Sequence, residues 1–253
     1  MIVTFLGTGT SQGVPVIACD CEVCNSMDFR DNRTRTSIHL EVNGQSFVID
    51  TGPDFRAQVL RERITKLDAV IFTHQHRDHT AGLDEIRSFN FRQKADMPVY
   101  ASKAVTKQLK EEFAYIFSDS GYPGLPKIVN HHISNEAFSI GETTIIPVEV
   151  MHHKLPVFGF RINDFTYLTD TNHIPDKEKD KIAGSKILVV NALQIKPHIS
   201  HFNLEEAIKV VNELKPEKAY FTHVSHNLGF HKQVEAELPE HIFLAYDGLK
   251  LQL

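Results

Sequence analysis

Short apolar runs alternate with amphipathic stretches along the whole chain of 253 residues. Apolar or alternating runs of about four to eight residues are typical of strands, whereas apolar positions that recur every three or four residues are typical of helices. These patterns predict strands at 2–6, 37–42, 45–50, 67–72, 97–100, 143–150, 158–162, 165–169, 187–190 and 218–222, with two closing strands within 242–253. They predict helices at 58–64, from 80 to about 91, at 104–117 and at 204–214.

The order of these elements indicates the fold class. Strand-rich segments separated by helices occur in both halves, and Asn43-Gly44 between two strands is a strong hairpin signal. We therefore expect an α/β protein with two packed sheets and outer helices, in one domain over residues 1–253. Segment 118–133 is the least regular part, and it could be a lid, a subunit contact or a plain surface connection.

Composition narrows the partners and the compartment. The formal net charge is −5 with acids and bases interspersed, so no global basic field attracts nucleic acid or an anionic membrane. No apolar run is long enough to span a bilayer, and the first residues lack the basic start and long apolar core of a secretory signal. We therefore expect a cytoplasmic protein that does not bind membranes.

The densest group of candidate metal ligands lies directly after the strand predicted at 67–72. His74, His76, Asp78 and His79 fall within six residues there. The two histidines at 74 and 76, two apart on an extended segment, can face one ion, while the other two side chains begin the next turn and face a neighbouring position. Scattered histidines on a surface loop are the alternative, but this spacing after an apolar strand favours two metals that share one loop.

Three later side chains, His152, Asp170 and His223, also follow predicted strands. Strand ends at one edge of a sandwich lie near one another, so these seven residues can form one site. Two divalent ions about 3.5–4 Å apart need about this number of ligands, one of them a bridging carboxylate. Our hypothesis gives one ion His74, His76 and His152 and the other Asp78, His79 and His223, with Asp170 shared.

Two further residues are weaker candidates. Asp50 ends a predicted strand, where it could support a ligand histidine or simply form an Asx turn. Arg87 is a candidate phosphate contact, although an ion pair on an exposed helix face explains it equally well.

All three cysteines, Cys19, Cys21 and Cys24, lie in one short loop. An odd, clustered set in a cytosolic protein argues for metal binding over a disulfide framework. Tetrahedral zinc needs a fourth ligand, which must be a histidine from elsewhere in the chain. Three unpaired buried thiols are the alternative.

The motif at 74–79, together with the loop at 7–15, Asp50-Thr51-Gly52 and the later candidate ligands, resembles the metallo-β-lactamase-fold hydrolases. More narrowly, the chain resembles the PhnP-type phosphodiesterases, which act on phosphoribosyl 1,2-cyclic phosphate. The narrower resemblance rests on segments 7–15, 19–24, 152–155, 168–171 and 222–226.

The resemblance has several implications for this chain. It implies an αββα sandwich of two mixed sheets packed face to face, and it places His226 as the fourth ligand of a structural zinc. His201 matches a non-ligand histidine thought to assist catalysis, and the resemblance makes a homodimer plausible.

The mechanism that follows is hydrolysis of a small or cyclic phosphodiester by a hydroxide that bridges two metals. Bound divalent ions lower the pKa of water towards about 7 and leave the site net positive, which suits an anionic diester. Asp78 would orient the nucleophile, and His201 would protonate the leaving alkoxide, a contribution worth about 10²–10⁴-fold. Zinc, manganese and iron all suit this set of ligands.

Three other functions use the same fold or a remnant of it. A tRNA 3′-processing nuclease would have a similar metal site, but such nucleases usually carry a protruding RNA-binding arm, and neither such an insertion nor a basic patch is apparent in the sequence. A protein like PqqB of redox-cofactor biosynthesis shares the clustered cysteines, though its usual metal motif is less complete. A non-catalytic scaffold would have lost ligands, and all seven candidate ligands are present in this sequence.

Overall fold

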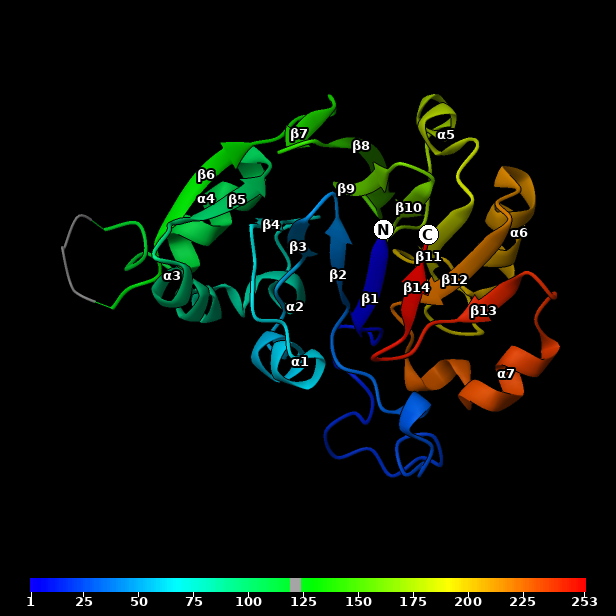
Figure 1. The fold of residues 1–253 in the computed structure, drawn as a ribbon. Coiled ribbons are helices and arrows are strands. Elements are labelled where there is room, and N and C mark those ends of the chain that lie inside the picture. Colours follow the sequence, from blue (N-terminus) through cyan, green and yellow to red (C-terminus); the bar gives the residue numbers. More distant parts are fainter. Residues whose placement is uncertain (119–123) are drawn as a thin grey trace.

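The computed structural model describes residues 1–118 and 124–253, and these form two seven-stranded sheets (Figure 1). In order across the first sheet, the strands are β14 Lys250–Gln252, β1 Ile2–Gly7, β2 Ser37–Val42, β3 Gln45–Ile49, β4 Ala69–Ile71, β5 Met97–Ala101 and β6 Ile128–His132. In the second they are β13 Ile242–Leu244, β12 Lys218–Thr222, β11 Ile187–Asn191, β10 Phe165–Tyr167, β9 Leu155–Ile162, β8 Thr143–His152 and β7 Phe138–Ile140. Both sheets are mixed, because β3 to β6 and β10 to β13 run parallel while the remaining pairs are antiparallel.

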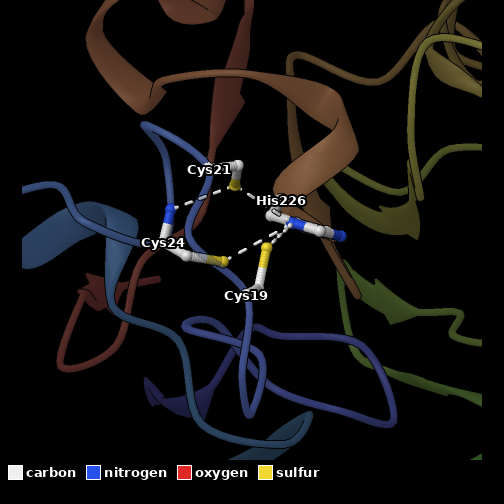
Figure 2. A group of neighbouring side chains, drawn as sticks. All are labelled: Cys19, Cys21, Cys24 and His226. Carbon is white, nitrogen blue, oxygen red and sulfur yellow. Dashed lines mark hydrogen bonds between the residues drawn. The ribbon is translucent and has the colours of Figure 1, made fainter.

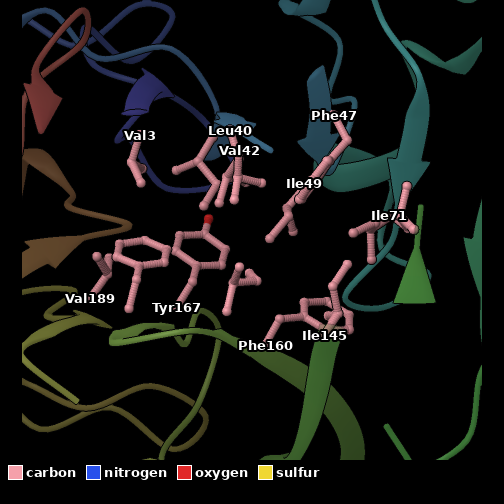
Figure 3. Close-up of a cluster of buried hydrophobic side chains, with 14 of the residues drawn as sticks. Val3, Leu40, Val42, Phe47, Ile49, Ile71, Ile145, Phe160, Tyr167 and Val189 are labelled. Carbon is pink, nitrogen blue, oxygen red and sulfur yellow. The ribbon is translucent and has the colours of Figure 1, made fainter. Parts of the chain in front are cut away.

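The inner faces of the two sheets share one core. Side chains from the first sheet, such as Phe47 and Ile49, pack against Phe160 and Tyr167 of the second, and all four are fully buried (Figure 3). Burying large apolar side chains in this way supplies most of the driving force for pairing the sheets.

Helices cover the outer faces. They are α1 Phe55–Glu62, α2 Arg77–Thr80, α3 Arg87–Gln93, α4 Lys103–Glu112, α5 Asp176–Ile182, α6 Leu204–Leu214 and α7 His231–Glu237, with 3₁₀ turns η1 Phe29–Asp31, η2 Leu83–Ile86 and η3 His226–Leu228. One outer cluster joins α1, α3 and α4 to the first sheet, and another joins α5, α6 and α7 to the second. The layers are therefore αββα, which confirms the predicted fold class.

The β2–β3 hairpin shows how local sequence sets the register. Val42 pairs with Gln45, which leaves a two-residue loop of Asn43 and Gly44. Both loop residues have positive φ, at 50° and 74°. A turn that needs two left-handed residues matches the right-handed twist of the strands and selects the Asn-Gly pair.

Several elements differ from the sequence expectation. The irregular segment contains a strand, β6, at its end, while its residues 119–123 lie outside the described part of the chain. The helix expected from 80 to 91 starts at Arg77 and is divided into α2, η2 and α3, and α4 ends at Glu112, earlier than expected. In the part of the chain that the structure describes, no helix has the length and apolar character needed to cross a membrane.

Candidate metal centre

The candidate ligands lie where strands of both sheets end. His152 is the last residue of β8, and Asp170 and His223 follow β10 and β12. Asp50, Asp170 and His223 all adopt the left-handed conformation, with φ of 67°, 52° and 55°. Residues other than glycine rarely take this conformation, and it is concentrated at functional sites. Here it breaks the alternation of the strand and turns these side chains towards a common centre.

The first group contains His74, His76 and His152. One ring nitrogen from each lies within 4.8 Å of the others. His74 Nε2 is 3.0 Å from His76 Nδ1, and the ring centroids of His76 and His152 are 5.1 Å apart. Three imidazoles converging in this way can bind one divalent ion.

The second group contains Asp78, His79, Asp170 and His223, with ligand atoms again within 4.8 Å of one another. His79 Nε2 is fully buried and has no hydrogen-bond partner among the described residues. It nevertheless lies 3.2 Å from Asp78 Oδ2 and 3.3 Å from Asp170 Oδ1. A buried nitrogen aimed at two carboxylates without bonding to either fits a cation between them.

Asp170 lies between the two groups. Its Oδ1 is 3.3 Å from His79 Nε2 and 3.1 Å from His223 Nδ1. Its Oδ2 is 3.9 Å from His74 Nε2 in the other group. One carboxylate with an oxygen turned to each group is the arrangement that a bridging ligand requires.

Four of the histidines have the second ring nitrogen, Nδ1, near a protein oxygen. These contacts are His79 with Asp50 Oδ2 (2.7 Å), His74 with Thr73 Oγ1 (2.9 Å), His152 with the Ser200 carbonyl (2.8 Å) and His223 with Thr36 Oγ1 (3.2 Å). For His74, His79 and His152 such a partner fixes the tautomer and leaves Nε2 free to bind a metal, whereas Nδ1 of His223 lies near both Thr36 and Asp170. Asp50 therefore lies where a supporting carboxylate was expected, whereas Thr36, Thr73 and Ser200 carried no signal of their own in the sequence.

The charge states also suit metal ligands. Burial lowers the pKa of His74 and His152, and it lowers the pKa of His223 to about 3, so these rings stay neutral. Burial opposes a charge on His79 as well, but the carboxylates of Asp170, Asp78 and Asp50 outweigh it and raise the pKa of His79 well above its usual value. A metal ion can replace that extra proton, since ligand imidazoles bind in the neutral form.

His201 lies against this centre. Its Nε2 is 3.3 Å from Asp170 Oδ2, and its ring stacks on the ring of His223 with centroids 4.9 Å apart. Together with His152 and Asp170 it also forms a metal-competent group. Arg87, the candidate phosphate contact, is half exposed and lies 4.0 Å from Asp84 Oδ2, which fits the surface ion pair.

The three cysteines surround His226, the first residue of η3 (Figure 2). His226 Nδ1 is 3.4 Å from Cys19 Sγ, 3.3 Å from Cys21 Sγ and 3.5 Å from Cys24 Sγ. Hydrogen bonds from the Cys24 backbone and from His226 lower the pKa of Cys21 to about 6, while burial raises the pKa of Cys24 to about 11. Three sulfurs and one nitrogen around a common centre fit tetrahedral zinc, which would also deprotonate the remaining thiols.

Two solved structures show how widely this fold is shared. A crystal structure of a diphosphatase from the PhnP family is 41% identical, covers 99% of this chain and 96% of its own, and superposes with a TM-score of 0.93. Zinc-bound PqqB from Methylobacterium extorquens is 19% identical over the full length of both chains with a TM-score of 0.80, which shows likeness of fold alone.

This chain matches only about half of the length of each of two curated relatives. An octanoyltransferase from Porphyromonas gingivalis is 36% identical over 97% of this chain and 50% of its own length. A ribonuclease Z from an Exiguobacterium species is 28% identical over 64% of this chain and 49% of its own. The chain thus spans about half the length of these relatives.

A family model described as the beta-lactamase superfamily domain matches residues 45–224. That range contains all seven candidate ligands of the two histidine and carboxylate groups, whereas the cysteine loop and His226 lie outside it. The chain therefore belongs to the beta-lactamase superfamily, as a metallo-β-lactamase-fold hydrolase of the PhnP-like type.

Proposed function

We propose that this protein is a dinuclear metal-dependent hydrolase that cleaves a small or cyclic phosphodiester. The observation that carries the proposal is the position of Asp170, whose two oxygens face different groups of ligands. In the proposal one ion is held by His74, His76 and His152, the other by Asp78, His79 and His223, and Asp170 is shared.

Two divalent ions held there would supply Lewis acidity and a hydroxide nucleophile near neutral pH. The protein's own groups set the rest of the chemistry. The Asp78 carboxylate stays ionised, because His79 and His223 outweigh the effects of burial and of Asp170 and hold its pKa well below the usual range. It is therefore available to accept a hydrogen bond from the attacking water and orient it towards phosphorus.

His201 is placed to act at the opposite end of the reaction. Its Nε2 edge lies at the bridging carboxylate, and its side chain is mostly buried at 11% exposed. A ring fixed there can donate a proton to a leaving alkoxide, which is a poor leaving group without one.

The cysteine group has a structural role in this proposal. Cys19, Cys21, Cys24 and His226 would hold one zinc, which ties the N-terminal loop to the segment after β12. Backbone bonds already join the same regions, because Val224 N donates to Thr8 O and Thr10 N donates to Val224 O. The zinc would therefore stiffen the margin of the catalytic centre.

A diphosphate is the second candidate substrate, favoured by the similarity to a PhnP-family diphosphatase. Cleavage of a diphosphate releases a phosphate group, which leaves without the help of an acid, whereas cleavage of a ribose cyclic phosphate releases an alkoxide. Activity on RNA is the further alternative that the ribonuclease Z relatives raise.

We do not extend octanoyl transfer to this chain. The Porphyromonas gingivalis relative is named for that activity, but this chain covers only half of it, so the other half is long enough for a domain of its own. We infer that an octanoyltransferase is a candidate partner of this chain. Co-elution of this protein with the unmatched half of the relative on size exclusion would support the pairing, and separate elution would count against it.

A paired assay on metal-quantified protein tests the proposed activity. Hydrolysis of bis-p-nitrophenyl phosphate, a ribose cyclic phosphate and a dialkyl diphosphate is compared with processing of a precursor tRNA. We expect turnover of the small diesters and a loss of about 10²-fold or more on the cyclic phosphate in His201→Ala at unchanged metal content. His173→Ala, an exposed histidine outside both metal groups, is the matched control.

Each other outcome changes the assignment. Cleavage of the tRNA alone would replace the proposal with a nuclease, and cleavage of the diphosphate alone would replace it with a diphosphatase. Full metal content without turnover of any substrate would refute phosphoryl hydrolysis.

A further inference from the structure

A short turn from His198 to His201 connects two parts of the metal centre. The Ser200 carbonyl accepts a hydrogen bond from Nδ1 of His152, at 2.8 Å. The Ser200 hydroxyl lies 3.1 Å from Nδ1 of His201. One residue of the turn thus contacts both a candidate metal ligand and the candidate acid.

His198 makes a second contact with the candidate acid. Its Nδ1 is 3.2 Å from Nδ1 of His201, with ring centroids 5.2 Å apart. The Ser200 backbone N–H points at the same His198 nitrogen, at 3.4 Å. A backbone N–H can only donate, so His198 Nδ1 accepts there, and a proton shared between the two rings would belong to His201. The Ser200 hydroxyl also lies 3.3 Å from His198 Nδ1 and 3.1 Å from His201 Nδ1.

The His201 ring is also fixed on its faces. It stacks on His223 with an interplanar angle of 13°, and it meets His152 edge to face with centroids 4.6 Å apart. Nδ1 of His201 faces His198 and the Ser200 hydroxyl, so the opposite nitrogen, Nε2, is the one that faces Asp170. Burial and the neighbouring His201 lower the pKa of His198, which agrees with its acting as a neutral acceptor.

We propose that His198 is a positioning residue for His201, holding its Nδ1–H so that Nε2–H is presented to the leaving group. This inference rests on the proposed function. As the bond between phosphorus and the leaving oxygen breaks, the Nε2 proton passes to that oxygen. His201 is left as a neutral ring that keeps Nδ1–H, and it regains a proton from water. In many hydrolases a carboxylate orients the catalytic histidine, and here a neutral imidazole takes that place.

Comparing substrates with different leaving groups distinguishes a positioning role of His198 from a structural role. Loss of positioning slows only those reactions in which the leaving group needs a proton. We expect His198→Ala to lower kcat on a ribose cyclic phosphate at least tenfold with little change in KM. On bis-p-nitrophenyl phosphate, whose nitrophenolate leaves unaided, we expect less than a twofold change.

Two further variants sharpen the test. His198→Asn offers an amide oxygen as acceptor and should recover part of the lost kcat. The double variant His198→Ala/His201→Ala should be no slower than His201→Ala, because the two residues act as one unit. An equal loss on both substrates, or a loss of metal in His198→Ala, would show a structural role and overturn the proposal, as would an unchanged kcat on the cyclic phosphate.

A spectroscopic measurement decides the matter independently of activity. In zinc-loaded protein, ¹⁵N NMR of the imidazoles should show a proton on Nδ1 of His201, with a signal that shifts in His198→Ala and not in His173→Ala. An unprotonated Nδ1 would overturn the positioning role. If wild type turns over neither substrate, the proposed function fails, and this spectrum alone supports or overturns the assignment of His198.

Discussion

Replacing Asp50 by asparagine should weaken metal binding, because it should move the ring proton of His79 from Nδ1 to Nε2. Asp50 is completely buried and accepts three hydrogen bonds. Its Oδ1 accepts from Thr73 N at 2.9 Å, and its Oδ2 accepts from Thr73 Oγ1 at 2.8 Å and from His79 Nδ1 at 2.7 Å. Asparagine has the same shape, but one of its two groups donates instead of accepting.

The orientation of the new amide follows from these contacts. If its oxygen keeps the bond to Thr73 N, its NH₂ faces His79 Nδ1 and forces that nitrogen to accept. The ring proton then moves to Nε2, the atom that lies 3.2–3.3 Å from Asp78 and Asp170. The opposite orientation sets the NH₂ against the Thr73 N–H, which costs about 1–3 kcal/mol for an unpaired buried donor. Losing such a partner typically lowers metal affinity about 10–100-fold, or about 1.4–2.7 kcal/mol.

Metal affinity itself is the assay. Competition with a chromophoric chelator, followed by metal analysis, should show one ion bound about 10–100-fold more weakly in Asp50→Asn, with the other two sites unchanged. Asp54→Asn is the matched control, because Asp54 lies four residues away and its carboxylate holds Arg35. Equal affinity in wild type and Asp50→Asn, or an equal loss in both variants, would refute the tautomer argument.

Three other variants test the zinc site, the pH response and the core. Cys24→Ser should lose one zinc per chain and melt at a lower temperature. Glu22→Ser in the same loop is the control and should show neither change. Full zinc content in Cys24→Ser would contradict the proposed zinc site. Burial, aided by Lys250, lowers the pKa of His39 from 6.5 to about 4, so the unfolded chain binds a proton there before the folded one does. The free energy of unfolding should then fall by up to about 3 kcal/mol as the pH drops from 6.5 to 4. The fall should be smaller in His39→Gln. If the free energy of unfolding depended on pH equally in wild type and His39→Gln, this role of His39 would be refuted. Phe160→Ala, between the sheets, should cost about 3–5 kcal/mol in urea denaturation, with Phe158→Ala on the same strand costing clearly less.

The layers and most strands could be predicted because they leave a strong signal in the sequence. A strand buried on one or both faces needs an apolar run, and a candidate ligand stands out as a metal-competent side chain within a few residues of the end of that run. His152 and His223 were identified in this way, and the structure brings them to one centre.

The elements that were missed lack that signal. Strand β6, Ile128–His132, is an edge strand with mostly exposed side chains, so no apolar alternation marks it. Helix α5 is charged on nearly all sides, so it has no clear apolar face in the sequence. Its buried Glu178 accepts hydrogen bonds from Asn135 and from the Glu149 backbone. The oxygens that contact the candidate ligand histidines could not be predicted either, because threonine hydroxyls and backbone carbonyls form no distinctive sequence motif.

The left-handed residues after the strands affect how the metal preference of the site could be altered by substitution. The backbone directs the candidate ligands Asp170 and His223, and also the supporting Asp50, and tertiary packing bears the cost of about 1–3 kcal/mol for each strained conformation. The direction in which a ligand leaves the chain is therefore a property of the position and not of the side chain that occupies it. Exchanging one ligand type for another at such a position would alter which metal is preferred while keeping the direction of approach. Moving the same ligand by a single residue along the chain would remove it from the site.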